Sequence, residues 1–312
     1  MKCLYCYKEI ESQNKFEFHS ACSKKIFETT VPPEIDIELK DIYELASESI
    51  NKSIAVPGVQ QKLSLTVNGN TSKGFTIVGL WGNYILKPPS NNYFQLPEIE
   101  DMTMHLAKFF GIETALHSLV RLRSGELAYI TKRFDRENSK KISVEDLCQL
   151  SGELTEHKYR GSLEKTGKII LKYSDRPGLD RIEFFEVCLF SFLTGNADMH
   201  LKNFSMFTDL KTGIKLTPSY DLLSTKLIIP EDNEESALTL NGKKSNLNRK
   251  DFYEFANTIE IEKKVFENIF KKFSMNFESG INFLDKGFLT SDNLHKFKTL
   301  LTERANRLEL IS

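Results

Sequence analysis

Gly-Asn-Ala-Asp-Met-His-Leu-Lys-Asn, residues 195–203, directly follows an apolar run with helical character at residues 182–193. Inside this segment a carboxylate, Asp198, and a carboxamide, Asn203, stand five residues apart. Taken alone, this spacing is common by chance. His200, beside Asp198, could be a metal ligand, although a structural histidine in a loop is the more frequent role. The segment therefore needs support from residues elsewhere in the chain.

That support comes from charged residues upstream and downstream. Phosphoryl transfer needs an oriented nucleophile and phosphates whose charge is neutralised by metal and lysine. Protein kinases provide an Asp, an Asn five residues later and a further downstream Asp. Asp198, Asn203 and Asp221 occur in that order, and Lys87 ends a strand-like run before Glu100 on the next predicted helix. Singly, Asp221 could be a helix N-cap or turn residue, Lys87 a solvated lysine at a strand end, and Glu100 a surface charge. Together the five residues favour a phosphotransferase.

Hydrophobic periodicity divides the chain into a sheet-rich and a helix-rich part. Alternating apolar residues predict strands at residues 62–67, 75–78, 84–87 and 127–130, with an Asn-Gly hairpin signal after the first. One helix, residues 97–111, interrupts them, and beyond residue 136 helices are expected at 182–193, 251–257, 261–276 and 292–308. This order predicts an α+β protein with two lobes and a cleft between them.

Composition narrows the class of protein. The chain has 312 residues, of which 40% are hydrophobic and 27% charged, and a formal net charge of -1. This balance argues against direct nucleic-acid binding and against attraction to an acidic membrane. No stretch predicts a membrane span or a secretory signal, so a cytoplasmic location with reduced or metal-bound cysteines is expected; export by a specialised secretion system is the open alternative.

Three cysteines and one histidine form a second motif near the N-terminus. Cys3, Cys6, His19 and Cys22 give the spacing C-x2-C-x12-H-x2-C. Two short ligand pairs can reach one ion, so this motif predicts a structural zinc site with no open ligand position. The alternative is four unlinked residues. A DNA-binding zinc finger is disfavoured because no basic helix lies beside the motif. Cys148 and Cys188 stand among apolar residues and are expected in the core.

Several of these segments resemble the motifs of HipA-type toxin kinases in the correct order. They are Gly195 to Phe204, the phosphate-loop segment 57–65, the strand ending at Lys87, residues 132–136 and residues 216–221. The resemblance covers roughly residues 53–290 and implies a two-lobed, protein-kinase-like (HipA-type) fold with a sheet-rich N-lobe and a helical C-lobe. It also implies an ATP- and Mg²⁺-dependent kinase that phosphorylates a serine or threonine of a protein.

The resemblance assigns roles to individual residues. Asp198 looks like the catalytic base, and Asn203 and Asp221 look like the magnesium ligands. Lys87 looks like the phosphate lysine and Glu100 like its ion-pair partner. The remaining ATP-binding candidates are Val59, Gln60 and Lys62 near the phosphates and Lys132 and Phe134 in the hinge beside adenine.

Regulation and partners are expected by the same resemblance. Family members autophosphorylate a serine just before the phosphate loop, and Ser53 is the candidate here. The expected target is an aminoacyl-tRNA synthetase, whose phosphorylation arrests translation and growth. About fifty residues precede the phosphate loop, as in the short HipT form of three-component systems; a small HipS-like protein and a HipB-like helix-turn-helix antitoxin are then expected partners.

The sequence also predicts domain boundaries and leaves one alternative function. The expected parts are a Cys/His module (1–30), a linker (31–52), a kinase N-lobe (53–133) and a helical C-lobe (134–312). The alternative to an active kinase is a nucleotide-binding module that acts by docking an antitoxin or another protein. The complete set of Lys87, Glu100, Asp198, Asn203 and Asp221 disfavours it.

Overall fold

A computed structural model describes most of the chain, as two units. The described residues are 1–11, 13, 15–43, 61–67, 74–78, 82–137, 140–209 and 212–311. The first unit comprises Met1–Asp101, Ala115–Arg133 and Lys286–Phe288, and the second comprises Met102–Thr114, Phe134–Asp285 and Leu289–Ser312. The chain thus passes between the units after Asp101, Thr114, Arg133, Asp285 and Phe288.

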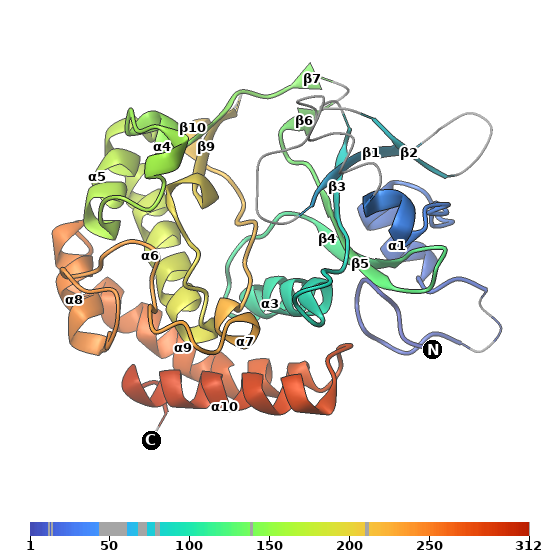
Figure 1. Cartoon of the computed structure of the whole chain (residues 1–312). Helices are drawn as coiled ribbons and strands as arrows, with labels where there is room; N and C mark the ends of the chain where they lie inside the picture. The colour runs from blue at the N-terminus through green and yellow to red at the C-terminus, as the bar shows by residue number, and fades with distance from the viewer. Residues whose placement is uncertain are drawn as a thin grey trace. The chain divides into compact units, whose positions relative to one another are not determined.

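The first unit is built on a five-stranded antiparallel sheet with the strand order β2-β1-β3-β5-β4 (Figure 1). Its strands are β1 (Leu63–Val67), β2 (Phe75–Ile77), β3 (Tyr84–Lys87), β4 (His117–Arg121) and β5 (Leu127–Lys132). The central strand β3 pairs with β5 so that Lys87 lies opposite Tyr129. Paired residues of an antiparallel sheet share one face, so Lys87 and Tyr129 lie on the same side.

The N-terminal segment shares one hydrophobic core with this sheet. Apolar side chains of the segment from Cys3 to Ile42, including Ile26 and Phe27 of helix α1 (Ser20–Phe27), are buried with residues of β1, β3, β4 and β5. The Tyr84 hydroxyl donates to Ile26 O (3.0 Å), and Leu119 N–H donates to Leu4 O (3.3 Å). Thirty residues enclose too little volume to bury such side chains alone. The separate module and linker proposed for residues 1–52 stay a prediction.

The second unit is mainly helical and has α6 at its core. Buried apolar side chains lie on all sides of α6, which is typical of a buried helix. Helix α6 packs against α5 and α10 (Figure 1). The helices wholly within this unit are α4 (Leu147–Leu150), α5 (Leu163–Tyr173), α6 (Pro177–Thr194), α7 (Thr225–Ile228), α8 (Arg249–Thr258), α9 (Lys263–Leu284) and α10 (Ser291–Arg307).

Helix α3 (Leu96–Phe109) begins in the first unit and ends in the second. Its apolar residues Ile99, Met102 and Leu106 are buried, as their helical spacing predicts. The Lys87 partner Glu100 lies in its second turn.

Short strands in the second unit were not expected from the sequence. They are β6 (Arg136–Glu137), β7 (Lys140–Lys141), β8 (Val144–Asp146), β9 (Ser205–Asp209) and β10 (Gly213–Leu216). Strands β8, β9 and β10 form one antiparallel sheet. Leu216 lies opposite Met206, so the β9–β10 hairpin returns the chain toward the end of segment 195–203. The sequence predicted a helix-rich part beyond residue 136 and did not indicate these strands, because they are too short for a periodic pattern.

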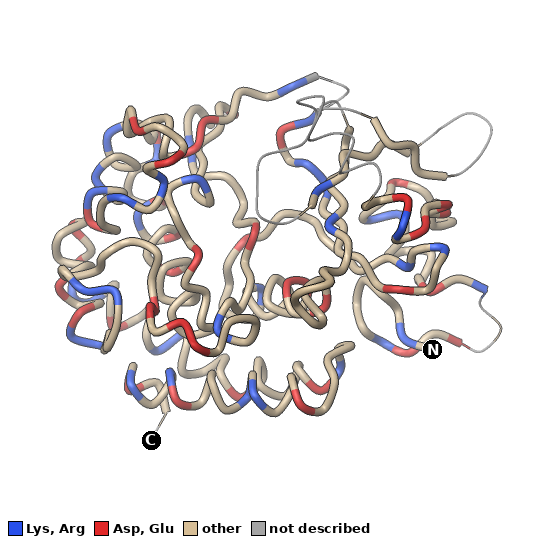
Figure 2. The backbone as a smooth tube through the Cα atoms, viewed as in Figure 1, with Lys and Arg blue, Asp and Glu red and all other residues tan. Residues whose placement is uncertain are grey.

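Charges of both signs are interspersed along the described chain. Figure 2 shows Lys and Arg interspersed with Asp and Glu along α10 and other helices, and the formal net charge of the chain is -1. Among the described residues, none of the helices combines the length and apolar character needed to cross a bilayer.

Candidate functional site

Gly195 ends α6 and turns the chain into the segment that carries Asp198. It adopts a left-handed conformation (φ 69°), which favours glycine. A Cβ atom at this position would lie 2.8 Å from Leu300 Cδ2 and 2.9 Å from Lys226 Cβ. Both the backbone angle and the surrounding atoms therefore require glycine at the start of this loop.

Hydrogen bonds then fix the loop from within. Asn196 Oδ1 accepts from the backbone N–H of Asp198 (3.1 Å), and Asn203 Nδ2 donates to Asp198 O (2.9 Å). From outside the loop, Thr225 Oγ1 accepts from Ala197 N–H (2.8 Å) and donates to Gly195 O (3.1 Å). The backbone N–H and the backbone carbonyl of Asp198 are thus both hydrogen-bonded, whereas its side chain is exposed.

The Asp198 carboxylate has a partner that sequence analysis missed. Tyr159, between the short 3-10 helix η1 (Thr155–His157) and α5, donates its hydroxyl to Asp198 Oδ1 at 2.7 Å. Burial and this bond raise the pKa of Tyr159 above its ordinary value, so the phenol stays a donor. The Lys158 carbonyl also accepts from Leu201 N–H (3.1 Å). No motif in the sequence joins Tyr159 to a residue 39 positions away.

Asn203 and Asp221 flank the β9–β10 hairpin. Asn203 ends the 3-10 helix η2 (Leu201–Asn203), and because its Nδ2 donates to Asp198 O, its Oδ1 is the atom left for a metal. Asp221 has a positive φ of 55°, an uncommon conformation for Asp. Helix α7 has Ser224 as its N-cap, so the alternative of Asp221 as an N-cap is wrong.

His200 lies near the carboxylates of Asp198 and Asp221. Burial lowers its pKa below the ordinary value, whereas the negative charges of Asp198 and Asp221 oppose that shift. The ring stands edge-on to Tyr159, with centroids 5.0 Å apart. His200 is therefore a buried residue of this loop that favours the neutral form. Its structural role stays a prediction.

In the first unit, Lys87 and Glu100 form a buried ion pair. Lys87 Nζ lies 2.5 Å from Glu100 Oε1, and their side chains are 5% and 1% exposed. Lys87 Nζ also stands 5.4 Å from the centre of the Tyr129 ring, which lies on the same sheet face. The pairing that the sequence suggested is present, and the alternative of a solvated strand-end lysine is wrong.

The other ATP-binding candidates differ in what surrounds them. Lys132 extends from the sheet face opposite Lys87, where its Nζ pairs with Glu28 Oε1 (2.6 Å). Phe134 packs in the second unit against Tyr220, with ring centroids 5.6 Å apart. Lys62 is half-buried directly before β1. Their contact with a nucleotide stays a prediction. Val59, Gln60 and Ser53 lie outside the described residues.

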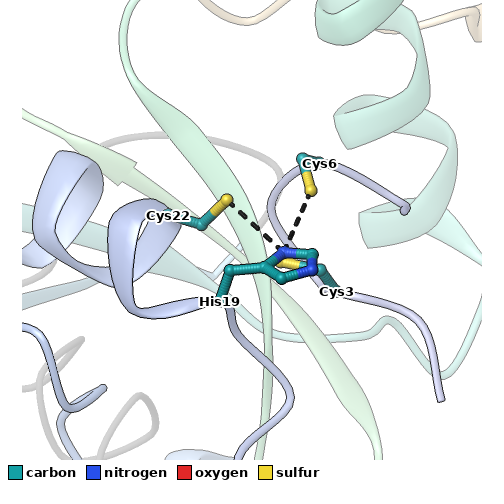
Figure 3. A group of neighbouring side chains, drawn as sticks. All are labelled: Cys3, Cys6, His19 and Cys22. Atoms are coloured by element: carbon teal, nitrogen blue, oxygen red, sulfur yellow. Dashed lines mark hydrogen bonds between the residues drawn. The ribbon is translucent and has the colours of Figure 1, made fainter. Parts of the chain in front are cut away.

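The Cys/His motif forms one compact cluster. The ligand atoms of Cys3, Cys6, His19 and Cys22 all lie within 4.8 Å of one another (Figure 3). Burial is the largest influence on the pKa of Cys3 and raises it, but backbone N–H donors nearby outweigh it and the pKa is lowered. Burial and the neighbouring sulfurs raise the pKa of Cys22. Cys148 and Cys188 are buried, as expected.

Each unit, taken by itself, holds donor types that suit a magnesium-bound nucleotide. The oxygens of Asn203 and Asp221 are hard ligands of the kind that Mg²⁺ takes in proteins. The ammonium of Lys87 is a point charge suited to phosphate, and Glu100 fixes its position. Asp198 presents an exposed carboxylate that can orient a hydroxyl and accept its proton.

Comparison with known proteins identifies the family and the fold. Residues 54–281 match the family described as HipA-like C-terminal domain. The fold is similar to that of HipA in a solved complex of Shewanella oneidensis MR-1 HipA, HipB and operator DNA. The TM-score is 0.70 at 20% identity, over 96% of this chain and 80% of that chain. This likeness confirms the predicted α+β, kinase-like fold.

Curated relatives share part of their length with this chain. Y4dM of Sinorhizobium fredii (strain NBRC 101917 / NGR234), which carries the name of an inferred kinase, is 35% identical over 214 residues. The serine/threonine-protein kinase toxin HipA of Shewanella oneidensis is 30% identical over 203 residues. These matches cover 64% and 58% of this chain, and 51% and 45% of the relatives. The chain therefore spans about half the length of these relatives.

Proposed function

The chain belongs to the HipA-like C-terminal domain family, and from this premise we propose that it is a protein serine/threonine kinase toxin of a toxin–antitoxin system. The observation that carries the proposal is the braced loop in which Asp198 is exposed while Asn203 binds its backbone. Such a loop presents a carboxylate and a metal-binding oxygen at fixed positions, which phosphoryl transfer requires.

Each residue has a defined task in the proposed reaction. Asp198 orients the acceptor hydroxyl and accepts its proton, and Tyr159 holds the Asp198 carboxylate through its hydroxyl. Asn203 and Asp221 would hold Mg²⁺. Lys87, fixed by Glu100, would neutralise phosphate charge. ATP, when bound, supplies the γ-phosphoryl group that is transferred. The proposal requires that the groups of both units act on one nucleotide.

The decisive experiment compares three proteins for transfer of label from radioactive ATP to proteins of a cell lysate. Asp198→Asn removes the proton acceptor and keeps the side-chain size, so labelling should fall by about 10²-fold or more. Asp292→Asn is the matched control, because Asp292 lies on α10 and its side chain is 71% exposed. Equal labelling by wild type and Asp198→Asn would refute the proposed activity.

The finer parts of the proposal concern targets, regulation and partners. The proposed acceptor is a serine of an aminoacyl-tRNA synthetase, and Ser53 is the proposed autophosphorylation site. A HipB-like antitoxin is a proposed partner, supported by the similarity to a HipA that was solved with HipB and operator DNA. A HipS-like small protein is proposed on the family resemblance, and the cytoplasmic location is proposed as the sequence analysis predicted it. Intact-mass analysis of wild type against Asp198→Asn tests Ser53.

A nucleotide-binding module that acts by docking remains the second candidate function. Growth arrest on expression separates the two. A kinase toxin loses its toxicity in Asp198→Asn, whereas a docking module keeps it, since the exposed carboxylate is the only group changed. Persistent arrest by Asp198→Asn without labelling would favour docking.

A further inference from the structure

Two chain segments present the four side chains of the N-terminal cluster. Cys3 and Cys6 lie on a tight turn that closes when Tyr7 N–H donates to Cys3 O (2.9 Å) and Cys3 N–H to Lys8 O (2.9 Å). His19 is the N-cap of α1, and Cys22 lies in its first turn. Figure 3 shows the three thiols and the imidazole pointing toward one another.

The His19 ring is oriented as a metal ligand. Its Nδ1 lies 3.4 Å from Cys6 Sγ and 3.8 Å from Cys22 Sγ. Its Nε2 lies 3.1 Å from Glu9 O, a carbonyl oxygen that accepts only. Nε2 therefore carries the proton, and Nδ1 presents its lone pair to the sulfurs. Metal-binding histidines use a backbone carbonyl in this way to fix the ring and its tautomer.

The donor set selects the metal. Three thiolates and one imidazole are soft ligands, and four ligands from two short pairs suit tetrahedral Zn²⁺. All five cysteines of the chain are free thiols, so no disulfide competes for these sulfurs. A closed set of four leaves no position for substrate, which makes the role structural.

The same turn reaches the helix that carries Glu100. Tyr7, directly after Cys6, has a positive φ of 63° and is buried. Its hydroxyl donates to Asp101 Oδ2, and Asp101 Oδ1 also binds His117 Nδ1 at 2.7 Å. Asp101 follows Glu100 in α3, and Glu100 holds Lys87. The Cys/His turn is thus one hydrogen bond away from the α3 turn that fixes Lys87.

We propose that Cys3, Cys6, His19 and Cys22 bind one Zn²⁺, which fixes Tyr7 against Asp101 and so positions Glu100 for its pair with Lys87. Tyr7 is a positioning residue that acts through α3. The zinc part stands on the cluster alone, whereas the effect on Lys87 also rests on the proposed kinase function.

Metal content and thiol protection test the zinc site without reference to activity. The full chain is purified with reducing agent and without chelator, and zinc is measured by mass spectrometry. About one zinc per chain is expected in wild type and in the control Cys148→Ser, with near zero in Cys22→Ser. Cys148 lies outside the cluster, in α4. Near-zero zinc in wild type with its thiols free would overturn the site.

If Cys22→Ser fails to fold, wild type alone decides. Cys6 and Cys22 are only half-buried, so iodoacetamide should modify them slowly until a chelator removes the metal. Equal alkylation before and after chelation, or a disulfide between any two of the three cysteines, would rule the site out.

Tyr7→Phe tests the positioning step. The variant keeps the ring and the ligands but loses the bond to Asp101, so zinc content should equal that of wild type. The KM for ATP should rise by about 2- to 30-fold, the range expected for coupling through packed neighbours, while Tyr253→Phe leaves it unchanged. An unaltered KM in Tyr7→Phe would refute the positioning role. An inactive wild type that contains zinc would instead refute the proposed kinase function.

Discussion

Lys87 and Glu100 are each less than about one-tenth exposed, so water solvates neither charge. The pair Lys87–Glu100 therefore links stability to the proposed chemistry. A buried ion pair adds little stability over an apolar pair of similar volume, but removing one partner leaves a charge without compensation. The two roles can be separated by changing the residues singly and together.

Glu100→Leu alone should lower the free energy of unfolding by about 3–5 kcal/mol, because it leaves the Lys87 ammonium buried. The double variant Lys87→Met, Glu100→Leu should recover most of this loss in urea denaturation. Phosphoryl transfer should stay absent in both variants. A double variant that regains activity would show that the pair is only structural.

His200 makes stability depend on pH. Its folded pKa is lowered, chiefly by burial, whereas an unfolded histidine titrates near 6.5. Below that pH the unfolded chain takes up a proton first, so stability is complete above about pH 6.5 and falls as the pH drops toward the folded pKa.

Wild type should therefore lose more unfolding free energy than His200→Gln when the pH falls from about 7 to 5. The charges around His200, those of Asp198, Lys158 and Asp221, are present in both proteins, so the comparison isolates the imidazole. Chemical denaturation at several pH values measures the difference. Parallel curves would contradict the prediction.

Among the elements, α6 gives the sharpest test of local geometry, since it has a glycine near each end. Gly195→Ala places a side chain at a positive φ and against Leu300, so it should destabilise the protein by about 1–3 kcal/mol. Gly178, near the start of the same helix, has open space around it. Gly178→Ala should therefore stabilise the protein by up to about 1 kcal/mol. Denaturation midpoints that move in the same direction would refute this account.

Elements with many periodic apolar residues were predictable, and those made by distant contacts were not. Helix α3, predicted at residues 97–111, is observed at Leu96–Phe109. Helix α9 runs to Leu284, beyond the predicted end at residue 276. Helix α5 and strand β4 were missed. In α5, Thr166 and Gly167 occupy half of the buried positions and weaken the apolar pattern, and in β4 the buried His117 and Ser118 interrupt it.

At the scale of the whole molecule, the α+β class followed from the order of sheet-rich and helix-rich parts. The order of Lys87, Glu100, Asp198, Asn203 and Asp221 suggested the chemistry before any contact was known. Tyr159 and the Tyr7–Asp101 bond could not be predicted, because they join residues 39 and 94 positions apart. Nor did the sequence indicate that the N-terminal residues share a core with the sheet.

The cysteines allow a prediction for the intact protein. Because all five are free thiols, a reducing agent should leave the melting temperature unchanged. A chelator should lower it by at least several degrees, since each 1 kcal/mol of lost stability shifts the melting temperature of a large domain by about 2–4 °C. Differential scanning calorimetry with each additive measures both effects. A protein insensitive to chelation would argue against structural zinc.

The dependence of the N-terminal segment on β4 and β5 affects the order of events on the ribosome. Those strands begin 95 and 105 residues after Cys22, a delay of about 5–20 seconds at a synthesis rate of about 5–20 residues per second. During that interval Leu4 lacks its partner in β4, the Leu119 N–H that donates to the Leu4 carbonyl. A bound metal would keep this nascent segment compact until β4 and β5 emerge. Zinc starvation should then reduce the yield of newly made protein while leaving finished molecules intact.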